Sequence, residues 1–142
     1  MSKKSTGELF IELKAEKNLK NYLRRNEGEF LLSLSEYLNN LLESKNLELK
    51  TVLKNCNLNR SYVYNIFSGE RKNPSRPKVL AIGLAMDLNL EEMQYLLRYA
   101  KQNLLYPRDT WDSVIISAIE QRLSVLQTNE LLESLGETVF LE

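Results

Sequence analysis

Apolar residues recur at helical spacing along most of the chain, and polar residues between them mark where helices begin and end. Residues 8–25 place leucines and a phenylalanine on one side of a single amphipathic helix. Glutamates open this helix and arginines close it, as the helix dipole favours. A second helix is predicted to begin near Ser33 and to fray near Lys45. Its apolar face consists of Tyr37, Leu38, Leu41 and Leu42.

Two short segments joined by a tight turn follow between residues 48 and 76. The first carries the apolar residues Leu49, Val52 and Leu53, and the turn is expected at Asn57–Leu58. The second, NRSYVYNIFSG, ends at a glycine and is followed by the basic, proline-containing stretch ERKNPSR. Two short helices, the second polar on its outer face and followed by basic residues, are typical of a unit that enters the DNA major groove.

The next helix is predicted to begin near Pro77, because proline is well tolerated in a first helical turn. It is apolar almost all round from residue 79 to 86, which indicates a central, buried helix. Asn89 and Glu92 then have the spacing of a capping box. In the helix that they open, four apolar residues are expected to face inward: Met93, Leu96, Leu97 and Ala100.

The motif resembles the helix-turn-helix of phage-repressor/Cro-type proteins, the XRE family. In this resemblance Leu53 takes the small-residue position, Asn57 replaces the turn glycine, and Gly69 ends the second helix. Asparagine is the next best residue for a left-handed turn. Leu49 stands where the family usually has glutamine, so a backbone phosphate contact made there is lost, and Phe67 stands where glutamate is common.

The likeness to the wider family covers about residues 34–100. A further likeness, to a branch of small bacterial regulators, extends to the C-terminus. It depends on three short signatures: Tyr62–Tyr64, Pro74–Arg76 and Leu105–Arg108. The resemblance implies a repressor-like five-helix domain that binds double-stranded DNA.

The chain repeats itself after Ala100 at a shift of 35 residues. Val79–Ala81 then falls on Val114–Ile116, and the capping positions Asn89 and Glu92 fall on Ser124 and Gln127. Either a second helical hairpin stacks on the first, or the match reflects only the general likeness of helical hairpins. In both cases residues 109–136 are predicted to be an all-α extension, with Gly136 as a helix stop. Tyr106–Pro107, near Trp111, is expected to form a buried hinge between the hairpins.

Composition excludes several function classes. The 142-residue chain has no histidine and one cysteine, so the usual zinc sites and His-dependent catalytic triads cannot form within it. No phosphate-binding glycine motif occurs, and Glu91–Glu92 are expected to be solvated, so neither an enzyme nor a cofactor is predicted. The single Cys56 and the lack of a secretory signal or membrane span predict a cytoplasmic protein without a disulfide.

The net charge of zero conceals a gradient. Residues 45–80 contain eight basic and two acidic residues, a net of +6, whereas residues 81–142 contain four basic and ten acidic residues, a net of −6. A basic stretch that coincides with the two-helix motif is expected of a protein that binds a polyanion. The alternative is a solvated polar face.

Helical spacing turns Val63, Ile66 and Phe67 of the second motif helix inward and leaves its other side chains outward or flanking. Arg60 suits guanine and Asn65 suits adenine, and by resemblance to the family Arg60, Ser61 and Asn65 match base-contacting positions. The predicted base contacts are Asn59, Arg60, Ser61, Tyr64 and Asn65. The predicted phosphate contacts are Tyr62, Ser68, Arg71, Lys72, Arg76 and Lys78. The tyrosine hydroxyls could reach phosphates, or the rings could pack on the first helix; Tyr64 is expected to be the more exposed.

The sequence thus predicts an all-α protein with three parts: an N-terminal helical arm at 1–30, a helix-turn-helix DNA-binding domain at 31–104, and a packed C-terminal extension at 105–142. The arm is either an extra packing helix, which we favour, or a dimerisation device. The predicted function is sequence-specific DNA binding as a transcriptional regulator, by a homodimer. The alternatives are a protein-interaction adaptor that no longer contacts DNA and an antitoxin whose acidic extension binds a protein partner.

Overall fold

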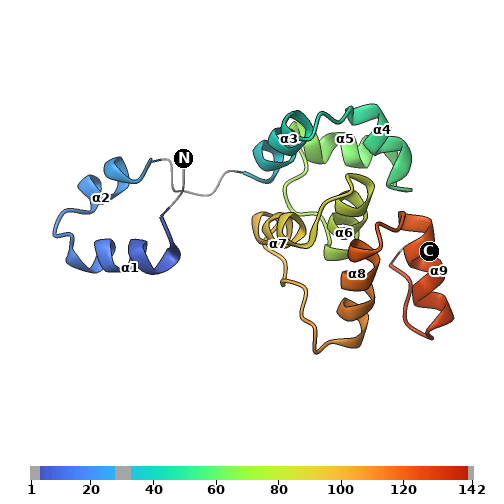
Figure 1. Cartoon of the computed structure of the whole chain (residues 1–142). Coiled ribbons are helices and arrows are strands. Elements are labelled where there is room, and N and C mark those ends of the chain that lie inside the picture. Colours follow the sequence, from blue (N-terminus) through green and yellow to red (C-terminus); the bar gives the residue numbers. More distant parts are fainter. Residues whose placement is uncertain (1–3, 28–32, 141–142) are drawn as a thin grey trace. The chain divides into compact units, whose positions relative to one another are not determined.

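The computed structural model describes residues 4–27 and 33–140 (Figure 1). Within these two stretches the chain forms nine α-helices and no strand, so the predicted all-α class is confirmed for them. The helices belong to two compact units, one within Met1–Leu32 and one within Ser33–Glu142. The domain boundary predicted at residue 30 lies outside the described residues.

The N-terminal unit is a helical hairpin. The prediction of one helix over 8–25 is wrong: α1 spans Thr6–Ala15 and α2 spans Leu19–Arg25. The break is local, because the Asn18 side chain accepts a hydrogen bond from the Lys20 amide and so caps a new helix. The Glu16 carboxylate accepts a second bond, from the Asn18 amide. Side-chain bonds of this kind compete with continued helix.

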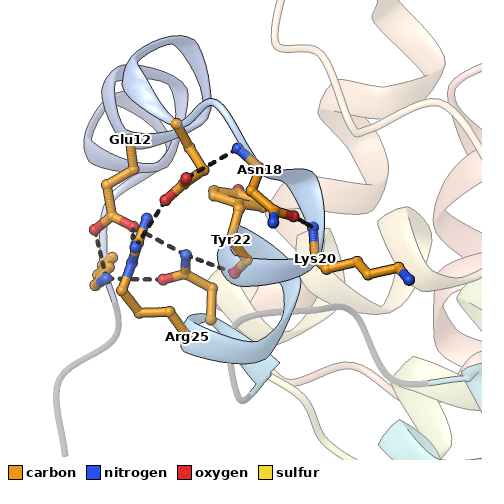
Figure 2. A network of polar contacts seen from close by, with 8 residues as sticks. Glu12, Asn18, Lys20, Tyr22 and Arg25 are labelled. Atoms are coloured by element: carbon orange, nitrogen blue, oxygen red, sulfur yellow. Dashed lines mark hydrogen bonds and ion pairs between the residues drawn. The ribbon is translucent and has the colours of Figure 1, made fainter.

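Polar side chains fill the inside of this hairpin. Glu12 of α1 and Arg25 of α2 point toward one another (Figure 2), and the Asn26 amide donates to the Glu12 carboxylate over 2.9 Å. Lys4 also pairs with Glu12, which lowers the pKa of Glu12 to about 2. Tyr22 is buried among these polar side chains, whereas five large apolar side chains are exposed: Phe10, Ile11, Leu13, Leu19 and Leu23.

The second unit opens with three helices: α3 (Leu34–Ser44), α4 (Leu49–Asn55) and α5 (Arg60–Ser68). Ser33 caps α3 as predicted, and Leu38 and Leu41 are buried. The turn between α4 and α5 contains Asn57 at a φ of 55°, so the predicted left-handed asparagine is confirmed. Asn59 caps α5 through its side chain, and Gly69 ends it at a φ of 91°.

Two side chains of α3 hold the end of α5. The Ser35 hydroxyl and the Asn39 amide both donate to the carbonyl of Phe67, over 2.5 and 2.8 Å. Phe67 itself is buried in the core. These bonds satisfy a carbonyl that the last turn of a helix would otherwise leave unpaired. They fix the C-terminus of α5 against α3.

Helix α6 (Arg76–Ala85) lies at the centre of the unit and packs against α4, α7 and α9 (Figure 1). Residues 79–84 are all buried, as the all-round apolar pattern predicts. Pro77 stands in the first turn. The capping box that opens α7 (Leu90–Tyr99) is confirmed, because Asn89 and Glu92 bond each other's backbone amides.

The C-terminal hairpin consists of α8 (Thr110–Glu120) and α9 (Val125–Ser134). The capping box of Ser124 and Gln127 is confirmed, and Gly136 follows the helix at a φ of 73°. Helix α8 packs against α7, and α9 packs against α6. Ile115 and Leu132 are fully buried in the same core as the first hairpin. The second hairpin therefore shares a core with the first.

The predicted buried hinge at Tyr106–Pro107 is wrong. Tyr106 is 56% exposed and Pro107 is exposed, whereas Leu105 is buried. The Gln94 side chain explains the difference: its oxygen accepts from the Leu105 amide and its nitrogen donates to the Leu105 carbonyl. This pair anchors Leu105 to α7 and turns the next residue outward.

Candidate nucleic-acid interface

Helix α5 has a buried side and a polar exposed side. Val63, Ile66 and Phe67 are at most 3% exposed, so the predicted inward face is confirmed. Tyr64 is 55% exposed and Tyr62 only half-buried, as expected. The segment contains no acidic residue. The exposed side therefore offers hydrogen-bond donors and hydroxyl groups without a repelling carboxylate.

The first turn of α5 gathers three of the predicted base contacts. Arg60 and Ser61 are exposed. Asn59 is exposed too, but its side-chain oxygen accepts the Tyr62 amide over 3.0 Å. The amide NH₂ of Asn59 remains available to a ligand. Asn65, one turn further on, is half-buried.

The end of α5 and the loop after it carry predicted phosphate contacts. The Ser68 hydroxyl donates to the carbonyl of Asn65 and accepts the Glu70 amide, so its hydrogen-bonding capacity is partly used. The backbone amide of Arg71 also donates to the Asn65 carbonyl, over 2.9 Å, which folds the loop back onto the helix. Arg71 and Lys72 are exposed.

Two cationic groups lie against the ring of Tyr62. The Arg71 guanidinium carbon is 4.6 Å from the ring centroid, and the Lys78 ammonium nitrogen is 4.2 Å from it. Tyr62 also packs against the hydrophobic core, so its ring is not free to swing away. Three separate elements, α5, the loop and α6, thus meet at one aromatic side chain.

The predicted phosphate contact of Arg76 competes with partners inside the protein. Its guanidinium forms two bonds of 2.9 Å with the buried carboxylate of Asp112, and it donates to the carbonyls of Asn103 and Leu104. With these partners most of its donors are occupied inside the protein. Asp112 was missed from sequence because it lies 36 residues away and no local pattern links the two positions.

The basic stretch divides into paired and unpaired residues. Lys45, Lys50 and Arg76 form ion pairs with Glu92, Glu48 and Asp112. The other five basic residues of 45–80 form no ion pair with any described residue: Lys54, Arg60, Arg71, Lys72 and Lys78. Four of these five lie on α5, on the loop after it or in the first turn of α6. Asp112, being buried and paired, adds nothing to an acidic surface of the extension.

Other chemistry has little support in the described residues. Cys56 is fully buried, and burial raises the pKa of its thiol, so it is poorly suited to act as a nucleophile. Across residues 4–27 and 33–140, His, Cys, Asp and Glu side chains form no cluster that could hold a metal ion. In the same two stretches, every helix is too short or too polar to cross a membrane.

Comparisons with protein-family models, with characterised proteins and with solved structures gave no significant match.

Proposed function

We propose that the unit within 33–140 binds double-stranded DNA sequence-specifically, with α5 in the major groove. The observation that carries this proposal is the two-sidedness of α5. Its apolar side is completely buried, and its exposed side begins with Arg60 and Ser61 and bears no carboxylate. An exposed helix whose first turn presents such donors suits base edges in the major groove.

The turn before α5 supports the resemblance to repressor-type helix-turn-helix proteins. Asn57 takes the left-handed conformation in which that family has glycine, and Leu58 after it is half-buried. α4 packs on α5, and α3 holds the α5 C-terminus through Ser35 and Asn39. A rigid support of this kind is needed for side chains that must meet fixed base edges.

The flanking cations suit the phosphate backbone. Arg71, Lys72 and Lys78 have no carboxylate partner among the described residues, so their charges are available to an external anion. Phosphate contacts supply sequence-independent affinity, and base contacts supply specificity. In this proposal Arg60, Ser61 and Tyr64 contact bases, joined by the NH₂ groups of Asn59 and Asn65.

A single helix contacts only a short site, so we expect a dimer on two half-sites about 34 Å apart, one turn of DNA. The homodimer remains a prediction, as does a role as a transcriptional regulator. Two half-sites within a bound sequence would identify the dimer directly.

The test is selection of bound sequences from a random duplex pool with the full chain, followed by titration of the selected duplex and of an unrelated one. We expect enrichment of a common sequence, tighter binding to it, and affinity that falls steeply with salt. Equal affinity for both duplexes would refute sequence-specific binding. Absence of any salt-dependent binding would refute the proposal and favour a protein-interaction adaptor.

A further inference from the structure

The ring of Tyr62 is half-buried, packs on the core and lies against two cations. The Arg71 guanidinium carbon, from the loop, lies 4.6 Å from the ring centroid, and the Lys78 ammonium nitrogen, from α6, lies 4.2 Å from it. Aromatic faces attract cations, so the ring fixes where these two charges stand.

The two charges have no counter-charge within the protein. Neither Arg71 nor Lys78 forms an ion pair with a described residue, and two like charges on one ring repel each other. Lys78 also stands in the first turn of α6, where the helix dipole disfavours a cation, and that turn contains no acidic residue. An external anion beside the pair would relieve both costs.

We propose that Tyr62, Arg71 and Lys78 form a phosphate-binding clamp in which the tyrosine ring is the positioning element and the two cations make the contact. This inference rests on the proposed function, because it takes a phosphodiester of duplex DNA as the anion. It differs from the sequence prediction that the Tyr62 hydroxyl itself reaches a phosphate. The ring holds two flexible side chains in place before DNA arrives, so less conformational freedom is lost on binding.

If the clamp is correct, changing the uncharged Tyr62 should alter how DNA binding depends on salt. Tyr62→Leu removes the aromatic face but no charge, and Tyr62→Phe removes only the hydroxyl. The probes are the duplex selected above and a 20-base-pair duplex of random sequence, titrated with the full chain at several salt concentrations. Circular dichroism melting of every variant establishes that it is folded, and Arg98→Ala, an exposed arginine stacked on Tyr95, is the matched control.

We expect Tyr62→Leu to weaken binding to both duplexes by about tenfold and to lower the slope of log affinity against log salt. Arg71→Gln and Lys78→Gln should each lower that slope by about one. Tyr62→Phe should leave affinity and slope unchanged, as should the control. In Tyr62→Leu, the further change to Lys78→Gln should cost less than it does in the wild type, because the lysine is no longer positioned.

Three results would overturn the clamp. An equal loss in Tyr62→Phe and Tyr62→Leu would mean that the hydroxyl contacts the DNA. An unchanged salt slope in a folded Tyr62→Leu would mean that the ring positions nothing. If Tyr62→Leu did not fold, unaltered salt slopes in Arg71→Gln and Lys78→Gln would be the refuting outcome.

The same titrations separate this inference from the proposed function. If the wild-type protein prefers the selected duplex but the variants have unaltered salt slopes, the clamp alone is refuted. If the wild-type protein binds both duplexes equally and the variants show the expected salt slopes, sequence-specific binding is refuted and the clamp is supported. Wild-type protein that binds neither duplex would overturn both.

Discussion

Removing the guanidinium of Arg76 should destabilise the protein. Arg76 makes two bonds of 2.9 Å to Asp112, whose side chain is only 7% exposed, and two more to the carbonyls of Asn103 and Leu104. In Arg76→Ala the Asp112 carboxylate would keep one backbone donor, the Tyr106 amide. A buried charge without its partner is strongly unfavourable.

The size of the effect follows from how buried the pair is. Breaking a fully buried pair by removing one partner costs about 3–5 kcal/mol. The Arg76 side chain is 22% exposed, so water screens part of the loss, and we expect about 2–4 kcal/mol. For a unit of this size that corresponds to a melting temperature lower by about 10–15 °C. The double variant Arg76→Met/Asp112→Leu, which leaves no orphaned charge, should recover most of the stability.

The assay is urea or thermal unfolding, followed by circular dichroism and by the fluorescence of Trp111. This is the only tryptophan of the chain, and it lies next to Asp112 in sequence, with its ring 6.0 Å from the Arg76 guanidinium. Arg98→Ala is the control and should change stability by less than about 0.5 kcal/mol. The reasoning is refuted if Arg76→Ala melts like the wild type and loses about one unit of salt slope, since Arg76 would then contact phosphate.

Four further outcomes are expected. Arg60→Ala should weaken binding to the selected duplex by about 1–3 kcal/mol and change random-duplex binding less; equal losses would exclude base contact. Lys72→Ala should weaken binding to all duplexes alike and lower the salt slope by about one, so an unchanged slope would place Lys72 off the backbone. Ending the chain at Ala100 should cost several kcal/mol, because α8 and α9 cover α7 and α6; a truncated chain with an unaltered melting temperature would contradict that. The pKa of Glu12 is lowered to about 2, chiefly by its bond to Lys4. The contribution of ionised Glu12 to hairpin stability should therefore be present above pH 4.5 and lost as the pH falls toward 2. An NMR titration that finds an ordinary Glu12 pKa would show that this bond does not form.

Features determined by neighbouring residues could be predicted from the sequence. The left-handed Asn57 follows from its residue type, and the capping box at Asn89 depends on side chains that bond backbone amides within three residues. The inward side of α5 also follows from local spacing. Predictions failed where a more specific local bond overrode the general pattern. Asn18 broke the expected first helix although the apolar spacing continues past it.

Contacts between distant residues could not be predicted. No local signal indicates that Arg76 pairs with Asp112. Its position beside a basic loop favoured a phosphate contact instead. The same holds for Tyr62, since two cations reach it from two other elements. A single sequence shows which residues are charged. It does not show which of those charges lack a partner, because the partners are brought together only by the tertiary fold.

These unpaired charges stand on a loop that the C-terminal part of the unit helps to hold. The loop that carries Arg71 leads to Pro74, whose carbonyl accepts the Gln102 side chain over 3.1 Å, and then to Arg76, which Asp112 binds. Those two anchors hold the end of the loop next to α6, and the Arg71 amide holds its other end on α5. Because the clamp needs Arg71 and Lys78 on the same ring, the extension bears on the interface although it contributes no contact to it. The helix pair of the extension therefore packs in the core and also holds, through Asp112, the end of the loop that carries these cations.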